Sequence, residues 1–88
     1  MAEHHDPGSA IGTVTHYFSH LSVAAIALRQ PLRVGDRIHV KGHTTDFVQS
    51  VESMQIEHGA ISQAGPGDDV ALQVSDHVRD GDLIFREE

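Results

Sequence analysis

Hydrophobic and polar residues alternate along several short runs of this chain, at positions 21–28, 37–41 and 70–75. Successive side chains of a β-strand point to opposite faces of the sheet, so this period of two predicts strands. The runs 11–18 and 83–86 mix β-branched and aromatic residues with polar ones and predict two further strands. No run has the 3.6-residue period of an amphipathic helix. The pattern therefore predicts an all-β fold.

Segments rich in glycine, proline and aspartate separate the predicted strands, for example at 35–36, 65–68 and 81–82. These residues form the tight turns of an antiparallel chain. About seven short strands are typical of a small antiparallel β-barrel or sandwich, and we expect a barrel because closure removes exposed edges. The pattern R-x-G-D-x-I occurs twice, at 33–38 and 79–84. Pseudo-symmetry, shared turn chemistry and chance each explain this repeat.

The alternation breaks within positions 44–58. Phe47 and Val51 share one parity, whereas Met54 and Ile56 share the other. A β-bulge near Glu52 or Ser53 would bring both sets to the core. A short helix is the alternative, but the β-branched residues of this segment favour a strand. We therefore expect an irregularity between Val51 and Met54.

The chain of 88 residues is long enough for one domain. Residues 1–10 are polar and lack a hydrophobic period, so we expect a disordered N-terminal tail followed by a single β-barrel domain over 11–88. Cysteine is absent, and no stretch approaches the roughly 20 apolar residues of a membrane span. The first residues lack the pattern of a secretory signal. We expect a cytoplasmic protein that does not engage a membrane.

The sequence gives little evidence for catalytic activity. A domain this small buries only about 60–65% of its unfolded surface, which leaves little room for a deep cleft. Serine, histidine and aspartate are present, but no nucleophile elbow or similar motif organises them. Asp68, Asp69, Asp80 and Asp82 form pairs, yet they occupy turn positions that aspartate favours. We therefore expect no enzyme activity, no catalytic residues and no cofactor.

The net charge of −7 argues against general affinity for nucleic acids, but the charge is unevenly distributed. Four of the six cations lie between positions 29 and 43, where Asp36 is the only acid, so this window carries +3 and the rest of the chain −10. An arginine cluster suits phosphate or carboxylate recognition, and a solvated strand face explains it as well. The candidate partner-binding residues of this basic strip are Arg29, Arg33, Arg37, His39, Lys41 and His43.

Eight histidines are many for a chain of this length. His16 with His20, and His39 with His43, are four residues apart, which suits one face of a helix but not of a strand. Without cysteine or interleaved acids, we expect surface or structural histidines and no metal site. Once the initiator methionine is removed, Ala2-Glu3-His4 has the donor groups of a square-planar Cu(II) or Ni(II) site. This spacing is common by chance, and metal binding at the terminus stays an open question.

Five segments of the chain, at 11–14, 32–42, 51–54, 64–72 and 79–84, carry a family resemblance. They read IGTV, LRVGDRIHVKG, VESM, AGPGDDVAL and RDGDLI, with Ala71 where glycine is usual. In this order they resemble the second, β-barrel domain of elongation factor Tu and related translational GTPases. The chain also resembles small stand-alone elongation-factor-like proteins that consist of this barrel alone. A related barrel ends some collagenase-like peptidase homologues involved in RNA modification.

The resemblance implies a non-catalytic binding module that contacts the ribosome, ribosomal RNA, tRNA or a translation-related protein. It does not imply GTP binding, because Lys41 is the only lysine and lies between Val40 and Gly42, outside any P-loop motif. The alternative is a protein–protein adaptor that docks a separately encoded enzyme, either RNA-modifying or peptidase-like. RNA binding falls steeply with salt, whereas an interface with an apolar centre does not. The sequence does not identify the partner, the oligomeric state or the pathway.

Overall fold

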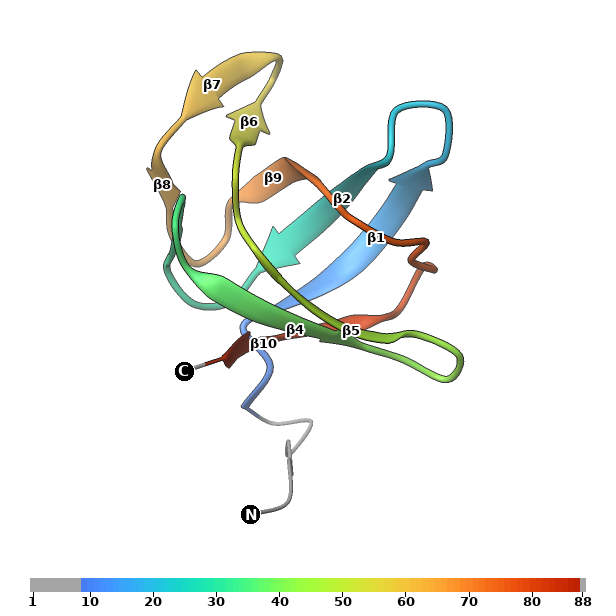
Figure 1. Cartoon of the computed structure of the whole chain (residues 1–88). Coiled ribbons are helices and arrows are strands. Elements are labelled where there is room, and N and C mark those ends of the chain that lie inside the picture. The colour runs from blue at the N-terminus through green and yellow to red at the C-terminus, as the bar shows by residue number, and fades with distance from the viewer. Residues whose placement is uncertain (1–8, 88) are drawn as a thin grey trace.

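The computed structural model describes residues 9–87, and within this range the chain forms ten β-strands and no α-helix (Figure 1). The all-β prediction is confirmed, with more and shorter strands than expected. No helix among these residues is long and apolar enough to cross a membrane. The strands are β1 (Gly12–Phe18), β2 (Val23–Leu28), β3 (Leu32–Arg33), β4 (Arg37–Lys41), β5 (Asp46–Ser50), β6 (Met54–Ile56), β7 (Gly59–Ile61), β8 (Gln63–Ala64), β9 (Asp69–Gln73) and β10 (Leu83–Glu87).

Eight of the strands form one antiparallel sheet in the order β5-β4-β10-β1-β2-β9-β6-β7, and β3 pairs with β8 in a separate two-stranded sheet. The larger sheet curls strongly on itself, as Figure 1 shows. Within residues 9–87, however, no ladder joins its edge strands β5 and β7. The antiparallel sheet was predicted correctly, but the closed barrel was wrong.

In the described residues, a chain segment and one side chain connect the two ends of the sheet, where a backbone ladder would be needed to close it. Residues 51–53 carry the chain from β5, which pairs with β4, to β6, which pairs with β9. Nearby, Gln49 Nε2 donates a hydrogen bond to the Gln73 carbonyl at 2.9 Å, and Gln49 Oε1 accepts one from the Ser75 N–H at 2.7 Å. A side-chain amide thus links β5 to the end of β9, where backbone pairing does not reach.

The irregularity predicted between Val51 and Met54 is confirmed, as a break between two strands and not as a bulge or helix. Both side chains are buried, although an unbroken strand would place them on opposite faces. The Val51 N–H donates to the Asp36 carbonyl, and the Val51 carbonyl accepts from the Gly35 N–H, both at 2.8 Å. These two bonds satisfy the Val51 backbone where the sheet ladder stops.

The core lies inside the curl and is built from the inward side chains of the strands. On β2, for example, Ala24, Ile26 and Leu28 are buried, in agreement with the period of two. Ala10, assigned above to the tail, is buried as well, whereas positions 1–8 with the Ala2-Glu3-His4 terminus lie outside the described residues. The buried cluster comprises Ile11, Val14, Ala24, Ile26, Leu28, Leu32, Ile38, Val40, Val51, Met54, Val70, Leu72, Val74, Val78 and Ile84.

β1 contains a β-bulge that the sequence analysis did not predict. After the bulge, the side chains that strict alternation would place in the core face solvent, and the others face the core. The register with β2 shifts between Val14 and His16, so Thr15 is the extra residue. Val14 is buried, and Tyr17 packs against the core three positions later. Strict alternation from Val14 would bury Phe18, but the bulge leaves that ring 43% exposed.

Shared turn chemistry explains the R-x-G-D-x-I repeat, because the same turn occurs three times, at 33–36, 65–68 and 79–82. In each, the first residue's N–H donates to Oδ2 of the aspartate at the fourth position, at 3.0, 2.9 and 2.8 Å. The aspartate N–H in turn donates to the first residue's carbonyl, at 3.1, 3.1 and 3.0 Å. The glycine at the third position has φ of 100°, 89° and 92°, a conformation that favours glycine.

The aspartate of the third turn, Asp82, is buried and packs against the end of β4. A Cβ added to Gly42 would lie only 1.9 Å from Asp82 Oδ1, so this close approach requires glycine. The Asp82 carbonyl accepts a hydrogen bond from the Val14 N–H at 2.8 Å. The turn therefore ties β1 to the loop that follows β4.

Candidate docking surface

The six residues of the basic strip do not form one continuous face in the structure. Arg37 and Lys41 are exposed at the two ends of β4, as alternation predicted. Arg33 is exposed on β3, in the smaller sheet. Arg29 follows β2 and its Nη2 lies 3.4 Å from Thr13 Oγ1 on β1, and His43 is exposed in the turn after β4.

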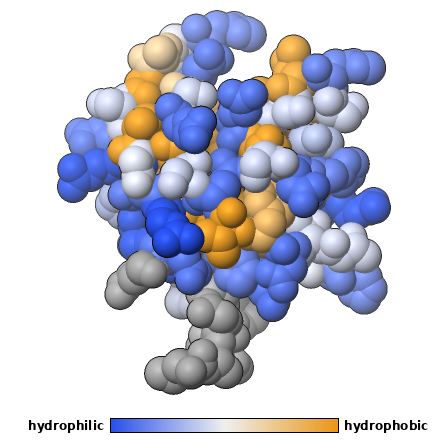
Figure 2. Space-filling view, in the orientation of Figure 1, coloured by the Kyte–Doolittle hydropathy of each residue, from blue (hydrophilic) through white to orange (hydrophobic). Residues whose placement is uncertain are grey.

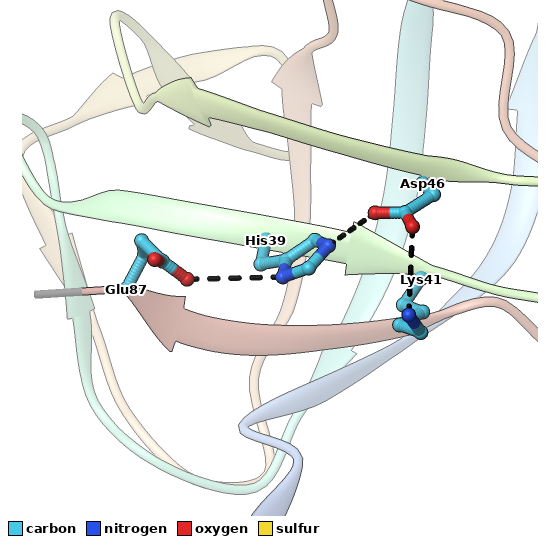
Figure 3. Close-up of polar contacts among 4 residues, drawn as sticks. All are labelled: His39, Lys41, Asp46 and Glu87. Atoms are coloured by element: carbon cyan, nitrogen blue, oxygen red, sulfur yellow. Dashed lines mark hydrogen bonds and ion pairs between the residues drawn. The ribbon is translucent and has the colours of Figure 1, made fainter. Parts of the chain in front are cut away.

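His39 has the same parity as Arg37 and Lys41, but its side chain is only 6% exposed. Its Nε2 lies 2.5 Å from Asp46 Oδ1, and its Nδ1 lies 3.7 Å from Glu87 Oε1 (Figure 3). The imidazole therefore lies between carboxylates from the two strands that flank β4. His39 is therefore part of the packed structure, whereas its contact with a partner stays a prediction.

Acidic neighbours reduce the positive charge of the strip. Asp46 Oδ2 lies 3.4 Å from Lys41 Nζ (Figure 3). The hydrogen bond from His39 lowers the pKa of the Asp46 carboxyl below its ordinary value of 3.8, and the charge of Lys41 lowers it further. At neutral pH Asp46 is therefore ionised beside Lys41. The local charge available to an anion is smaller than the sequence indicated.

Two of the other histidines contact aromatic rings. The His16 ring meets Phe18 edge-on at 4.4 Å between centroids, and the His77 ring meets Tyr17 in the same manner at 4.6 Å. Within residues 9–87 no group of three histidine or acidic side chains is arranged to hold a metal ion.

A shallow groove, which the sequence analysis missed, crosses the outer surface of β2, β9 and β6. Its main part has a volume of about 360 Å³. The floor is low because Ala25 of β2 and Ala71 of β9 face each other in the ladder, with Gln55 of β6 opposite Ala71 on the other side. A second depression shares Leu21, Val23, Gln55 and Ala71 with the first and extends it toward Ser53 and Gln73.

Apolar side chains form one side of this groove and acidic side chains form the other. Phe18 and Leu21, which are 43% and 65% exposed, come from the end of β1 and the β1–β2 turn. Glu57 and His58 come from the β6–β7 turn, and Asp69 begins β9. None of the described residues that line the groove is a lysine or arginine.

Exposed hydrophobic side chains are otherwise scattered over the surface. Figure 2 shows small hydrophobic groups separated by hydrophilic residues on one face of the molecule. In the described range four large hydrophobic residues are exposed, and two of them, Phe18 and Leu21, border the groove. The other two, Val34 and Val48, lie outside it.

No protein-family model matches the chain. A Methanocaldococcus jannaschii protein named as an uncharacterized protease is 38% identical over 76 residues, which cover 85% of this chain and 19% of that protein. A collagenase of Porphyromonas gingivalis is 32% identical over 78 residues, which cover 86% of this chain and 22% of the collagenase. This chain thus spans about a fifth of the length of the curated relatives it matches.

The solved structure of the C-terminal domain of a Geobacillus thermoleovorans protein, named as a U32 peptidase, matches the chain with a TM-score of 0.87. The fold is that of this C-terminal domain. The alignment covers 98% of this chain and 100% of that domain at 21% sequence identity. The selenomethionine variant of the same domain matches with a TM-score of 0.82 and 22% identity, over 89% of this chain.

The resemblance to the second domain of elongation factor Tu is therefore wrong. The relatives are named as protease and collagenase, and the matching structures are C-terminal domains of a U32 peptidase. Much of the resemblance rested on glycine-aspartate turns leading into strands. The three equivalent turns show that this motif reflects hydrogen bonding by aspartate, which any β fold can use. The expected roles in translation and RNA binding are corrected with it.

Proposed function

We propose that this chain is a non-catalytic docking domain that accompanies a peptidase-like enzyme and binds its catalytic part. The observation that carries the proposal is the coverage of the sequence match, 85% of this chain against 19% of the M. jannaschii protease. A module that recurs as a small part of larger proteins, and whose fold occurs as a C-terminal domain, fits an accessory role. A cytoplasmic location, supported by the absence of cysteine, is part of the proposal.

The surface chemistry supports docking to protein. The groove has an apolar side and a floor of small residues, which are the features of an interface centre. A standard interface buries about 800 Å² on each partner, so the groove would be the middle of a wider contact. The acidic net charge and the pairing of Lys41 with Asp46 disfavour an anionic partner.

The test is a calorimetric titration of the purified chain with a peptidase-like protein from the same organism. That protein is prepared without any segment of its own that matches this chain. We expect saturable 1:1 binding with a dissociation constant on the order of micromolar, and a negative heat-capacity change from buried apolar surface. The affinity should fall far less between about 0.05 and 0.5 M salt than that of an RNA complex, because screening weakens charge contacts and not apolar ones.

Two outcomes contradict this function. The first is the absence of binding heat at concentrations well above the micromolar range. The second is binding that disappears after ribonuclease treatment, which would identify RNA as the bound species. Peptide hydrolysis by the purified chain alone would contradict the non-catalytic part of the proposal.

A further inference from the structure

Specific features of the backbone keep two apolar side chains, Phe18 and Leu21, exposed to solvent on one side of the groove. The bulge at Thr15 turns Phe18 outward, where strict alternation would bury it. Leu21 lies in the four-residue turn that follows, in which the Leu21 N–H donates to the Phe18 carbonyl at 3.0 Å. This turn includes Ser22 at φ 54°, in the left-handed region. The backbone thus presents both side chains to solvent, although their burial would be favourable.

The opposite side of the groove is formed by a strained hairpin turn. Ile56 and Gly59 pair across a two-residue loop of Glu57 and His58, which have φ of 50° and 69°. A two-residue loop with positive φ at both positions favours Asn-Gly, because in this region the Cβ of most residues lies too close to the backbone carbonyl oxygen. Both residues nevertheless carry large polar side chains that line the groove. Strain of this kind is concentrated at functional sites.

Charge identifies what would bind between these two sides. Glu57 and Asp69 place two carboxylates beside the apolar floor, and the described residues of the lining include no lysine or arginine. Ala25 and Ala71 leave space on the floor for a side chain from outside. An apolar side chain would fill that space, and a neighbouring cation would pair with the carboxylates.

We propose that the groove binds a segment of the peptidase-like partner in which a large apolar residue is adjacent to lysine or arginine. This inference rests on the proposed function and specifies the contact. The apolar residue lies on Ala25 and Ala71, against Phe18 and Leu21, and the cation faces Glu57 and Asp69. A second copy of this chain is a poorer occupant, because a symmetric contact would bring two acidic rims together.

The experiment repeats the titration with the same partner protein and with two groove variants. Leu21→Asp places a charge on the apolar side and should weaken binding about a hundredfold, as expected for a central apolar contact. Glu57→Lys with Asp69→Lys should weaken it about tenfold through charge repulsion. The matched controls are Val34→Asp, at a valine that is 42% exposed outside the groove, and Asp76→Lys with Asp80→Lys. Both controls should bind like the wild type.

Amide chemical shifts of the wild-type chain give a second measurement that does not depend on a folded variant. Addition of the partner should shift the amides around Ala71 and Glu57 more than those around Val34. If the wild type binds the partner, but the groove variants bind equally and the groove amides do not shift, this inference is wrong and the docking function stands. If the wild type does not bind, both fail. Self-association that Leu21→Asp abolishes would make a second copy the occupant and overturn the proposal.

Discussion

The basic strip and the groove differ in how their chemistry is encoded. The strip is visible in the sequence, because its cations lie within fifteen consecutive positions. Folding reduces the positive charge that the strip exposes, since His39 is buried and Lys41 pairs with Asp46. The groove cannot be recognised from the sequence, because its floor is formed by residues from three strands. The comparison teaches that clustered charge in a linear sequence does not by itself indicate a free charged surface, and that a groove built from several strands is not evident from a sequence read in order.

The largest effect is expected at Gly42, beside the end of the strip. Gly42→Ala would place a methyl group 1.9 Å from Asp82 Oδ1, so the strand end and the turn at 79–82 must move apart. We expect a loss of about 2–3 kcal/mol in the free energy of unfolding, as for overpacking. Urea denaturation measures it. Gly65→Ala is the control, because its added methyl group meets no atom within 4 Å, and its stability should stay near that of the wild type.

An effect of opposite sign is expected on the groove side. Replacement of Glu57 and His58 by Asn and Gly would relieve two left-handed residues in the β6–β7 turn. We expect the variant to be more stable by about 1–2 kcal/mol and yet to bind the partner more weakly. Thermal unfolding and titration of the same sample test both parts. A variant that gains stability and keeps full affinity would mean that the strained turn has no part in docking.

Much of the fold was predictable from local rules. Period two identified the main strands, and the loss of parity identified the break between Val51 and Met54. The bulge at Thr15 escaped prediction, because a shift of one residue in a β-rich segment leaves no compositional mark. Barrel closure was also wrongly predicted, since strand count alone does not determine whether the edges pair. The Gln49 contacts that link β5 with Gln73 join residues far apart in the sequence.

The candidate site was less predictable than the fold. Alternation correctly predicted that Arg37 and Lys41 are exposed. It failed for His39, because β4 lies between two strands and Phe85, the ladder neighbour of His39 on β10, is buried on the same part of the sheet. Burial of a strand residue depends on what neighbouring strands place around it, and one sequence read in order does not reveal those neighbours.

A smaller effect is expected when the charge of the strip is changed. Arg37→Glu with Lys41→Gln alters two exposed side chains of β4 and should change stability by only a few tenths of a kcal/mol. Partner affinity, measured by calorimetry, should stay within about twofold of the wild type, because the strip is not expected to form the contact. Complete loss of binding would mean that the partner is anionic and that the strip, not the groove, is the docking surface.

The smallest effect concerns Asp46, whose carboxylate masks the charge of Lys41. Because folding lowers the pKa of Asp46, ionisation of this group favours the folded state. The contribution is complete above the ordinary value of 3.8 and is lost as the pH falls through the lowered value. The carboxylate is 61% exposed, so the effect on stability is small. Carbon NMR titration of the side chain measures the pKa directly.

Two variants separate the causes of this shift. The hydrogen bond from His39 is the larger cause, so His39→Phe should raise the pKa of Asp46 further than Lys41→Met does. An equal rise in both variants would mean that Lys41 matters as much as the buried imidazole. Which of the two variants raises the pKa of Asp46 further bears on the comparison of the basic strip with the groove. If the hydrogen bond from His39 is the larger cause of the lowered pKa, the packed sheet holds Asp46 in place. Asp46 then stays beside Lys41 regardless of the conformation of the lysine side chain. The masking of the strip is then built into the fold, whereas the groove remains open to a partner.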